Sequence, residues 1–383
     1  MAGPIYQPRV QQNGEAADPT TKVPPFTYTD VKQAIPEKYF KPSIPRSLFY
    51  CARDFFFAAS LFIAVNLLDR LLVDNGLPWA RFVLWPAYWF AQGTIFWAIF
   101  VVGHDCGHGS FSRSVLLNEI IGTFTHASIL VPYNSWRISH RRHHSNTGSV
   151  EHDESWYPTS KKDYESLNSV TRFLRYDLFM FLWPLYLLGF RGRDSSGHQG
   201  EFGFGGSHFD PYCDLFKEHE RPGVVRSSLA VLVVLVAVLK LGWTFGAVFM
   251  VANYWLPWVI FSMWLAIVTY LHHHDVSIPW YRSEEWQKLR GALSTIDVSY
   301  GKVIDHIHHD IGTHVVHHIF HQIPHYHLKD ATEAVKPLLG KYYRKSNRGV
   351  IGGLWDAHKG CKYIPDEGGV VFFNGYYEKN KAH

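Results

Sequence analysis

Two pairs of long apolar runs interrupt an otherwise polar chain of 383 residues. A helix needs about 20 apolar residues to cross the hydrocarbon core of a bilayer, and each run is close to that length. Only a short turn separates the two runs of each pair, so each pair predicts a helical hairpin with both outer ends on one side of a membrane. The runs cover residues 55–73, 82–103, 229–245 and 250–270.

Two further apolar stretches do not fit a membrane span. Residues 120–133 are too short to cross, so we expect an interfacial or re-entrant piece. Residues 173–190 begin among charged side chains and contain Pro184, which favours an aromatic helix lying in the membrane interface. Residues 191–226 are rich in glycine and charge and predict a loop region.

Three histidine clusters lie beyond these runs, all on the side of the outer ends. In a helix, their spacing puts the imidazoles of each cluster on one face. Imidazole suits iron, copper, zinc and nickel, and eight nitrogens exceed the four that one tetrahedral ion takes. The pattern therefore predicts two metal ions, each with a position left for an exogenous ligand. The predicted catalytic metal ligands are His104, His108, His140, His143, His144, His314, His317 and His318.

Other kinds of metal protein explain the clusters less well. The first cluster, His104-Asp-Cys-Gly-His108, has the spacing of a zinc-protease motif, but Asp replaces the glutamate base and six histidines would have no role. A metal transporter would place its histidines inside the spans. A site beside a bilayer has aliphatic chains as its nearest substrate, and oxidising them needs dioxygen and a redox metal, which zinc is not. We therefore expect two iron ions.

Further histidines and carboxylates surround the three clusters. We expect His273 as a ninth ligand, and His308 or His309 as ligands or as hydrogen-bond partners of ligands. Carboxylates could accept the second N–H of ligating imidazoles; the candidates are Asp105, Asp153, Glu154, Asp305 and Asp310. The remaining histidines are expected to be interfacial, structural or ordinary surface residues: His126, His152, His321, His325 and His327.

The distribution of charge orients the chain in the membrane. Of 37 Lys and Arg residues, only Arg70, Arg81 and Lys240 fall in the spans or in the short turns that connect the two helices of each hairpin. The positive-inside rule then makes the histidine side cytosolic, with both termini on that side. A net charge of +4 without a dense basic run gives no reason to expect a nucleic-acid partner.

The two ends of the chain bear on its expected location in the cell. Residues 1–54 are polar and proline-rich, lack a signal peptide and predict a cytosolic N-terminal segment. Residues 379–383 read Lys-Asn-Lys-Ala-His, a KxKxx pattern of cytosolic retrieval signals for endoplasmic-reticulum membrane proteins. The four scattered cysteines predict reduced thiols rather than disulfides.

The boxes H-x3-H, H-x2-H-H and H-x2-H-H, with two apolar hairpins, resemble the membrane fatty-acid desaturases over nearly all of residues 25–383. Several stretches are most similar to plant endoplasmic-reticulum omega-3 desaturases. These stretches are HDCGHGSFS (104–112), LVPYNSWRISHRRHH (130–144), HDESWYP (152–158) and HHDIGTHVVHHIFHQIPHYHL (308–328).

The resemblance implies an all-α integral membrane protein with four transmembrane helices in two hairpins and a cytosolic helical cap that carries a diiron site. Residues 55–378 would form the desaturase domain. The implied oxidoreductase inserts a cis double bond at the omega-3 position of a dienoic acyl chain, linoleoyl-type or of 16 carbons, esterified to phosphatidylcholine. Dioxygen is the co-substrate, and electrons come from NADH through cytochrome b5 and its reductase. Homodimers, or heterodimers with other desaturases, stay open.

Two departures keep other activities open. The stretch HRRHHSNTGS (140–149) is more similar to omega-6 (delta-12) desaturases, and His321 stands where a proline is usual. An omega-6 desaturase, or a hydroxylase, epoxygenase or acetylenase, would share every box. A membrane protein that only binds or transports metal is the non-enzymatic alternative.

Overall fold

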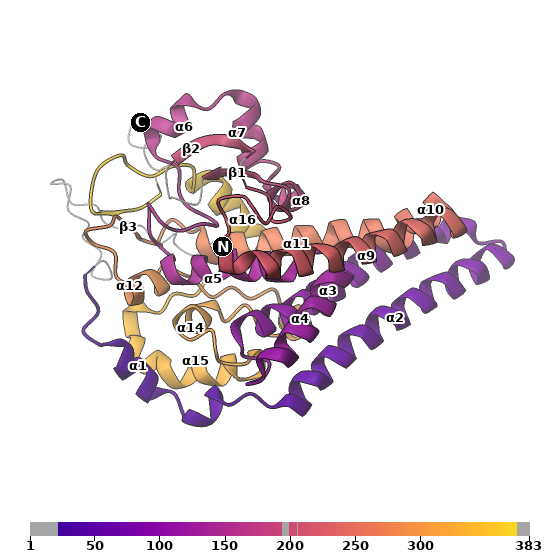
Figure 1. The fold of residues 1–383 in the computed structure, drawn as a ribbon, viewed down its shortest axis with the longest axis horizontal. Coiled ribbons are helices and arrows are strands. Elements are labelled where there is room, and N and C mark those ends of the chain that lie inside the picture. The colour runs from indigo at the N-terminus through magenta and orange to yellow at the C-terminus, as the bar shows by residue number, and fades with distance from the viewer. Residues whose placement is uncertain (1–21, 194–198, 205, 374–383) are drawn as a thin grey trace, which may run out of the picture.

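The computed structural model describes residues 22–193, 199–204 and 206–373, and most of them are helical. Four long helices form an arm that projects from a rounded cap of shorter elements (Figure 1). The arm helices are α2 (Ile44–Asp74), α3 (Arg81–His108), α9 (Arg221–Phe245) and α11 (Leu256–His273). The retrieval pattern predicted at 379–383 lies outside the described residues.

The cap is assembled from short helices and two small sheets. The antiparallel pairs are β1 (Phe190–Arg193) with β2 (Gln199–Phe204), and β3 (Trp280–Tyr281) with β4 (Val370–Val371). The short α-helices are α1 (Tyr28–Ala34), α6 (Lys161–Ser166), α12 (Lys288–Ala292), α13 (Lys302–Ile307), α14 (His314–Ile319), α15 (His325–Leu339) and α16 (Gly349–Gly360). The 3-10 turns η2 (Glu37–Phe40), η5 (Glu218–Glu220) and η7 (Gly340–Tyr342) lie in the cap, whereas η3 (Pro78–Ala80) joins α2 to α3 at the tip of the arm (Figure 1).

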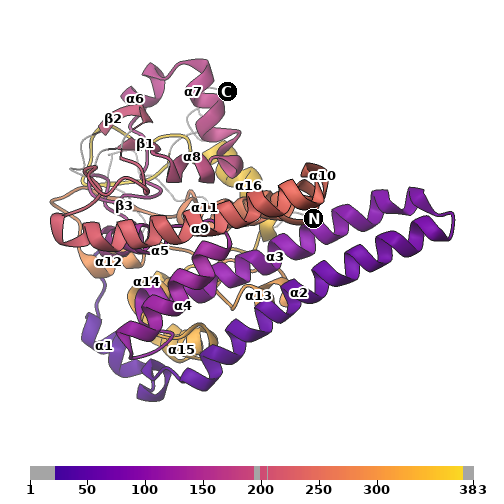
Figure 2. The ribbon, with the colours of Figure 1, turned by 45° about the vertical axis from the view of Figure 1, so that its right-hand side comes forward.

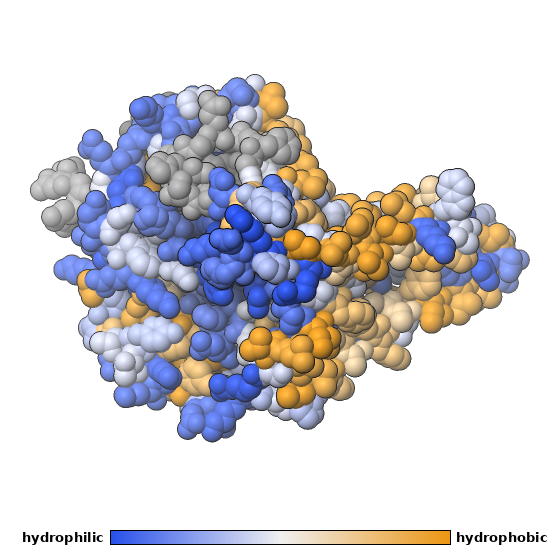
Figure 3. Space-filling model, in the orientation of Figure 1, coloured by the Kyte–Doolittle hydropathy of each residue, from blue (hydrophilic) through white to orange (hydrophobic). Residues whose placement is uncertain are grey.

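The surface of the arm is apolar. On α2, Phe56 is 66% exposed and Ile63 56%, and on α9, Val233 is 69% exposed. Such exposure of large apolar side chains marks a surface that something apolar must cover. Figure 3 shows the contrast between the apolar arm and the largely hydrophilic cap.

Among the described residues, three helical stretches are long and apolar enough to cross a membrane: Ile44–Asp74, Glu218–Phe245 and Ala247–His273. They contain the predicted spans 55–73, 229–245 and 250–270. The remaining predicted span, 82–103, forms most of α3, which is 28 residues long but is not one of the three. The second half of this helix lies inside the bundle, since every residue from Gln92 to Cys106 is buried, whereas Phe82 and Val83 near its start are exposed.

The second hairpin contains an irregular turn. Gly246, with a φ of 95°, ends α9 and is followed by α10 (Ala247–Met250) and a π-helical turn, η6 (Val251–Trp255). In that turn the side-chain oxygen of Asn253 accepts a hydrogen bond from Asn66 of α2 at 2.8 Å. A polar pair between apolar helices fixes how the two hairpins pack.

Helices α4 (Val115–Ser128) and α5 (Tyr133–Asn146) form a bent pair with an angle of 104° between them. The break contains Leu130, whose φ of 58° is unusual for a residue other than glycine. The pair includes the stretch 120–133 that the sequence analysis assigns to an interfacial or re-entrant piece.

Two expectations about the cap were wrong. Residues 173–190 do not form one helix. They contain the end of α7 (Ser169–Tyr176), then η4 (Phe179–Phe181) and α8 (Trp183–Leu187). Pro184 can begin a helix but cannot continue one, so it starts α8 instead. Residues 191–226 are not loop throughout, because they contain most of the β1–β2 hairpin and the first turns of α9.

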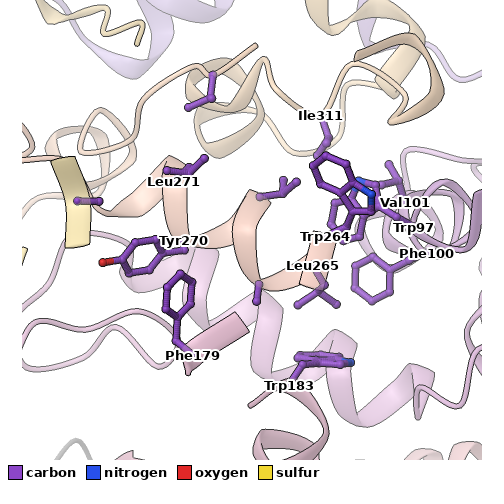
Figure 4. Close-up of a cluster of buried hydrophobic side chains, with 14 of the residues drawn as sticks. Trp97, Phe100, Val101, Phe179, Trp183, Trp264, Leu265, Tyr270, Leu271 and Ile311 are labelled. Carbon is purple, nitrogen blue, oxygen red and sulfur yellow. The ribbon is translucent and has the colours of Figure 1, made fainter. Parts of the chain in front are cut away.

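A large aromatic core lies where α3 and α11 enter the cap. Trp97 and Phe100 of α3 pack near Trp264 and Leu265 of α11 (Figure 4). Phe179 of η4 lies against Tyr270, with ring centroids 4.3 Å apart. A second, smaller core joins α1, α14 and α15 on the opposite side of the cap. The first core therefore packs the cap ends of α3 and α11 together, and the second core anchors α14, which carries the third histidine cluster.

Candidate metal centre

The histidines of the three clusters come together although up to 214 residues separate them in sequence (His104 to His318). His104 and His108 are in the last turns of α3, which ends at Gly109 in the left-handed conformation. The other clusters are on α5 and α14, and His273 is the last residue of α11. Figure 1 shows α5 between α11 and α14 in the cap, and Figure 2 shows the same region with α9 crossing in front of it.

The ring nitrogens form two groups, and within each group they lie within 4.8 Å of one another. The first group is His104, His108, His140, His144 and His317; the second is His143, His273 and His318. His314 belongs with the second group, because its Nε2 is 3.1 Å from that of His273 and 2.9 Å from that of His318. All eight box histidines and His273 are thus assembled at one place.

The nitrogen spacing fits metal coordination. The Nε2 atoms of His104 and His108 are 3.2 Å apart, and those of His140 and His144 are 3.1 Å apart. Nitrogen ligands about 2.1 Å from one ion lie about 3.0 Å from their neighbours when they occupy adjacent octahedral positions. One cation per group could therefore be coordinated by nitrogens whose lone pairs otherwise face each other.

The electrostatics also suit metal binding, because ligating histidines must be neutral. Burial, and secondarily the neighbouring imidazoles, hold the pKa of His140, His144 and His318 well below the usual histidine value. The same causes lower the pKa of His314 and His317. At neutral pH these rings are uncharged and each keeps a lone pair.

Hydrogen bonds on the far side of the rings fix which nitrogen faces the centre. The Nδ1 of His143 lies 2.7 Å from Asp153, and that of His318 lies 3.0 Å from the Thr147 hydroxyl. Since a carboxylate only accepts, His143 must donate from Nδ1, and its Nε2 then has the free lone pair. The Nδ1 of His104 is 3.5 Å from Asp105.

The family description "Fatty acid desaturase" matches residues 81–348, which include all of these histidines. The chain belongs to the fatty acid desaturase family. It is 46% identical over 360 residues to an omega-3 fatty acid desaturase of the endoplasmic reticulum from Vigna radiata var. radiata, covering 91% of this chain and 89% of that one.

Two further relatives differ in the electron donor that they are named for. An Arabidopsis thaliana protein named acyl-lipid omega-3 desaturase (cytochrome b5), endoplasmic reticulum, is 46% identical, covering 94% of this chain and 90% of its own. A Nostoc protein named sn-1 acyl-lipid omega-3 desaturase (ferredoxin) is 43% identical, covering 97% and 96%. The likeness to both spans nearly the whole length of this desaturase.

Of the five candidate carboxylates in the desaturase, only Asp105 and Asp153 contact rings of the box histidines. Glu154 pairs with Arg142 at 3.5 Å. Asp305 accepts hydrogen bonds from Ser299 and from the backbone of Tyr300. The fifth, Asp310, pairs with a lysine of α15.

The other histidines separate into distinct roles. His308 is buried against Trp97 and Trp264, away from both groups. His309 lies 2.6 Å from the buried carboxylate of Asp54 in α2. His325 donates to Asp105 at 2.8 Å, so it supports the first box through that carboxylate.

Three histidines lie at the edges of the centre or outside it. His321 is beside the first group, with its ring centroid 4.8 Å from that of His108. His126 is buried, and its Nε2 lies 3.1 Å from the carbonyl of Phe100. His152 is exposed, and His327 is only partly buried.

Sequence reasoning missed several residues that hold the centre of this desaturase. Asp297 accepts a hydrogen bond from the backbone N–H of Val315 at 2.8 Å, at the start of α14. His272 stacks on His314, with centroids 4.2 Å apart, and its Nδ1 donates to the carbonyl of Ile296 at 2.6 Å. The only sequence signal for these residues was the triplet that contains His272, since Asp297 lies in an ordinary polar stretch.

A cavity of about 190 Å³ opens beside the assembled histidines of the desaturase. Its walls include His104, His140, His143, His273 and His314, so both histidine groups face it. The remaining wall is mostly aromatic and aliphatic, with Phe100, Phe179, Trp183, Leu265 and Tyr270 among the lining residues (Figure 4). Such a cavity suits an apolar chain better than a polar substrate.

Proposed function

We propose that this member of the fatty acid desaturase family is an omega-3 acyl-lipid desaturase that converts a dienoic chain to a triene. The observation that carries the proposal is the apolar cavity whose wall contains histidines of both groups. The omega-3 position is supported by relatives at 43–47% identity that carry this activity in their names. The finer assignment is a linoleoyl-type or 16-carbon diene.

We propose two iron ions as the metals, held by the eight box histidines and His273. When bound, such a pair supplies the redox chemistry that activates dioxygen for attack on an unactivated C–H bond. The chain itself orients the rings of His143 and His318 through Asp153 and Thr147. Its aromatic cavity keeps water away and aligns two adjacent methylene groups with the centre.

The reaction removes two hydrogen atoms from neighbouring carbons of the acyl chain. Together with dioxygen, two electrons and two protons, it gives a cis double bond and two molecules of water. The electron source that we propose is NADH through cytochrome b5 and its reductase, as in the name of the Arabidopsis relative. The Nostoc relative is named for ferredoxin, so a reconstitution with each donor is the direct comparison.

We also propose a four-span topology in the endoplasmic-reticulum membrane, with both termini and the cap in the cytosol. The three apolar helical stretches and α3 between them support four crossings. The distribution of Lys and Arg supports the orientation. Relatives named for the endoplasmic reticulum support the compartment, although other relatives of similar identity are chloroplastic.

The test is lipid analysis of yeast that expresses the chain and is fed oleate, linoleate or a 16-carbon diene. We expect trienes with the new double bond at the omega-3 position. Dienes from oleate would move the assignment to an omega-6 enzyme, and oxygenated products to a hydroxylase or epoxygenase. His317→Ala should abolish conversion, whereas His152→Ala, at an exposed histidine outside both groups, should not.

A further inference from the structure

The first turns of α2 carry a polar face, although the rest of this helix is apolar. Ser47, Tyr50 and Asp54 are three and four residues apart, which puts them on one side of the helix. The Ser47 hydroxyl is 3.3 Å from that of Tyr326 on α15, and the Tyr50 ring centroid is 4.7 Å from that of His325. Asp54, the last residue of this face, is fully buried. A buried carboxylate is costly, and on a membrane helix it usually has a specific role.

Asp54 is paired with a histidine of the cap. The Nε2 of His309 lies 2.6 Å from its Oδ2, and this nitrogen donates, because a carboxylate only accepts. Arg53 pairs with the other oxygen at 2.8 Å. His309 and Asp310 both have a left-handed backbone, with φ angles of 56° and 54°. This conformation is unfavourable for residues other than glycine and persists only where the surroundings impose it. The loop before α14 thus holds His309 against α2 at an energetic cost.

His309 in turn packs against a histidine that reaches the first box. The ring centroids of His309 and His325 are 4.4 Å apart. This link is a packing contact, because the Nδ1 of His309 and the Nε2 of His325 have no hydrogen-bond partner among the described residues. On its other side, His325 donates to Asp105 twice, from Nδ1 at 2.8 Å and from its backbone N–H at 3.2 Å.

Asp105 completes the path to a predicted ligand. Its second oxygen lies 3.5 Å from the Nδ1 of His104, which has no hydrogen-bond partner in the described part of the chain. A carboxylate on that side of a ligating imidazole fixes the orientation of the ring. The carboxylate must itself be held, and His325 holds it with two donors. All the side chains on the path are buried: Asp54, His309, His325, Asp105 and His104.

We propose that Asp54 and His309 are positioning residues for His104. They act through His325 and Asp105, and they tie the membrane helix α2 to the first histidine box. The proposal rests on the proposed function, because it takes His104 to be a metal ligand.

Binding of Co²⁺ to the purified, metal-free, full-length protein tests this without relying on turnover. The visible absorption bands of bound Co²⁺ report the geometry of its ligands, and a titration gives the affinity. Asp54→Asn keeps the size of the side chain and removes its charge. We expect the Co²⁺ affinity to fall by about threefold to tenfold, less than the roughly 10- to 100-fold typical of direct partners of ligands. The bands of only one bound equivalent should shift, because His104 belongs to the first group alone.

A double-mutant cycle decides whether Asp54 acts through Asp105. If it does, Asp54→Asn should cause no further loss of Co²⁺ affinity in a protein that already carries Asp105→Asn. His309→Asn is a second single variant, in case Asp54→Asn does not fold. Asparagine tolerates the left-handed backbone of this position, but its shorter side chain loses the contact with Asp54. We expect the same loss of affinity as in Asp54→Asn.

Asp69→Asn is the matched control. Asp69 is on the same helix, and its carboxylate pairs with Arg81 at 2.6 Å near the other end. Unchanged Co²⁺ affinity and absorption bands in Asp54→Asn and His309→Asn would overturn the proposal. So would an equal loss in Asp69→Asn, or a loss in the double variant equal to the product of the two single losses.

Failure of this proposal can be told apart from failure of the proposed function. If the wild type binds Co²⁺ and both variants bind it in the same way, only the positioning role is refuted. If the wild type binds Co²⁺ but desaturates no acyl lipid, the proposed function is refuted, and the cycle still decides the positioning role. If the wild type binds no Co²⁺, the histidines form no metal centre and both proposals fall.

Discussion

Asp153 and Glu154 are neighbours in sequence, yet only Asp153 contacts a ring of the candidate metal centre. Asp153 accepts from the ring of His143 at 2.7 Å, and also from the backbone N–H groups of Gly148 and Ser155. Glu154 pairs with Arg142 instead. Which of two adjacent carboxylates faces a ligand depends on how the loop after α5 turns, and sequence spacing alone does not give that.

Replacing the supporting carboxylate should weaken metal binding. In Asp153→Asn the amide oxygen can still accept from the Nδ1 of His143, but without charge, so the ring is less basic and less firmly oriented. We expect a 10- to 100-fold loss in iron affinity or turnover, which is typical for such partners. The measurement is iron per protein by atomic emission, together with the rate of triene formation.

Glu151→Gln is the control for this substitution. Glu151 lies two residues earlier and pairs with Arg282, away from the ligands. Equal iron content in Asp153→Asn and Glu151→Gln would show that the carboxylate does not support the ligand.

At the scale of elements, α3 is held so closely that its glycines are not equivalent. A Cβ on Gly103, the residue before His104, would lie 2.2 Å from the His126 ring. A Cβ on Gly107, the residue before His108, would have its nearest neighbour at 3.4 Å, an ordinary contact. Only the first position requires glycine for the approach of α4 to α3.

Gly103→Ala should therefore displace α3 from α4 and move the first box. We expect the free energy of unfolding to fall by about 1–3 kcal/mol, as for overpacked cores. We also expect the variant to bind less iron. Gly107→Ala, in the same helix and equally close to a ligand, should keep both. Thermal melting followed by size-exclusion chromatography in detergent measures the difference. A tolerated Gly103→Ala would mean that α4 does not pack as described.

A second element-level feature is the carboxylate at the start of α14. Burial raises the pKa of Asp297 to about 6, although hydrogen bonds from Val315 and Tyr343 act in the opposite direction. The folded protein therefore binds this proton more tightly than the unfolded chain does. The resulting stabilisation is present below the ordinary aspartate pKa and is lost as the pH rises through about 6.

Asp297→Asn stays neutral at every pH and should lack this dependence. The buried histidines, whose pKa values are lowered, destabilise both proteins alike as the pH falls. Their effect cancels in the difference between wild type and variant. Between pH 7 and pH 4 we expect the free energy of unfolding of the wild type to increase relative to that of the variant, by up to about 3 kcal/mol. Melting curves of metal-free protein would show it, and parallel curves would contradict it.

At the scale of the whole molecule, the features that could be predicted from the sequence are those that depend on patterns within a few residues. The apolar runs and the spacing within each histidine cluster predicted the long helices and which rings share a face. What it could not predict are contacts across the chain, such as Asp54 with His309 and Asp105 with His325, which are 255 and 220 residues apart. No local pattern carries that information, because such pairs form only when α2, α3 and α15 are packed.

The cavity could not be predicted from the sequence for the same reason. Its aromatic wall is drawn from α3, η4, α8 and α11, and each of these residues reads locally as ordinary core. The ninth histidine was predicted, however, because the triplet 272–274 directly follows an apolar run. It remains a prediction that His273 is a ligand, since its position beside His143 and His318 shows proximity rather than coordination.

The proposed topology makes a prediction for the turn between α2 and α3. A glycosylation acceptor inserted with a short spacer at Asn75–Gly76 should be modified in microsomes, because that turn would face the lumen. The same insertion after Ser166, at the end of α6 in the cap, should stay unmodified. A shift in mobility that is reversed by an endoglycosidase provides the measurement. Modification at the second site and not the first would invert the orientation.

The nine assembled histidines are contributed by four helices, and several of their ring nitrogens face one another at about 3 Å. Without a cation only hydrogen bonds between the rings join these nitrogens, so the ends of α3, α5, α11 and α14 should separate more easily. Cellular quality control removes proteins that open in this way. We therefore expect iron starvation to shorten the lifetime of the protein in the cell, so that iron supply would set how much of it is present as well as how fast it works.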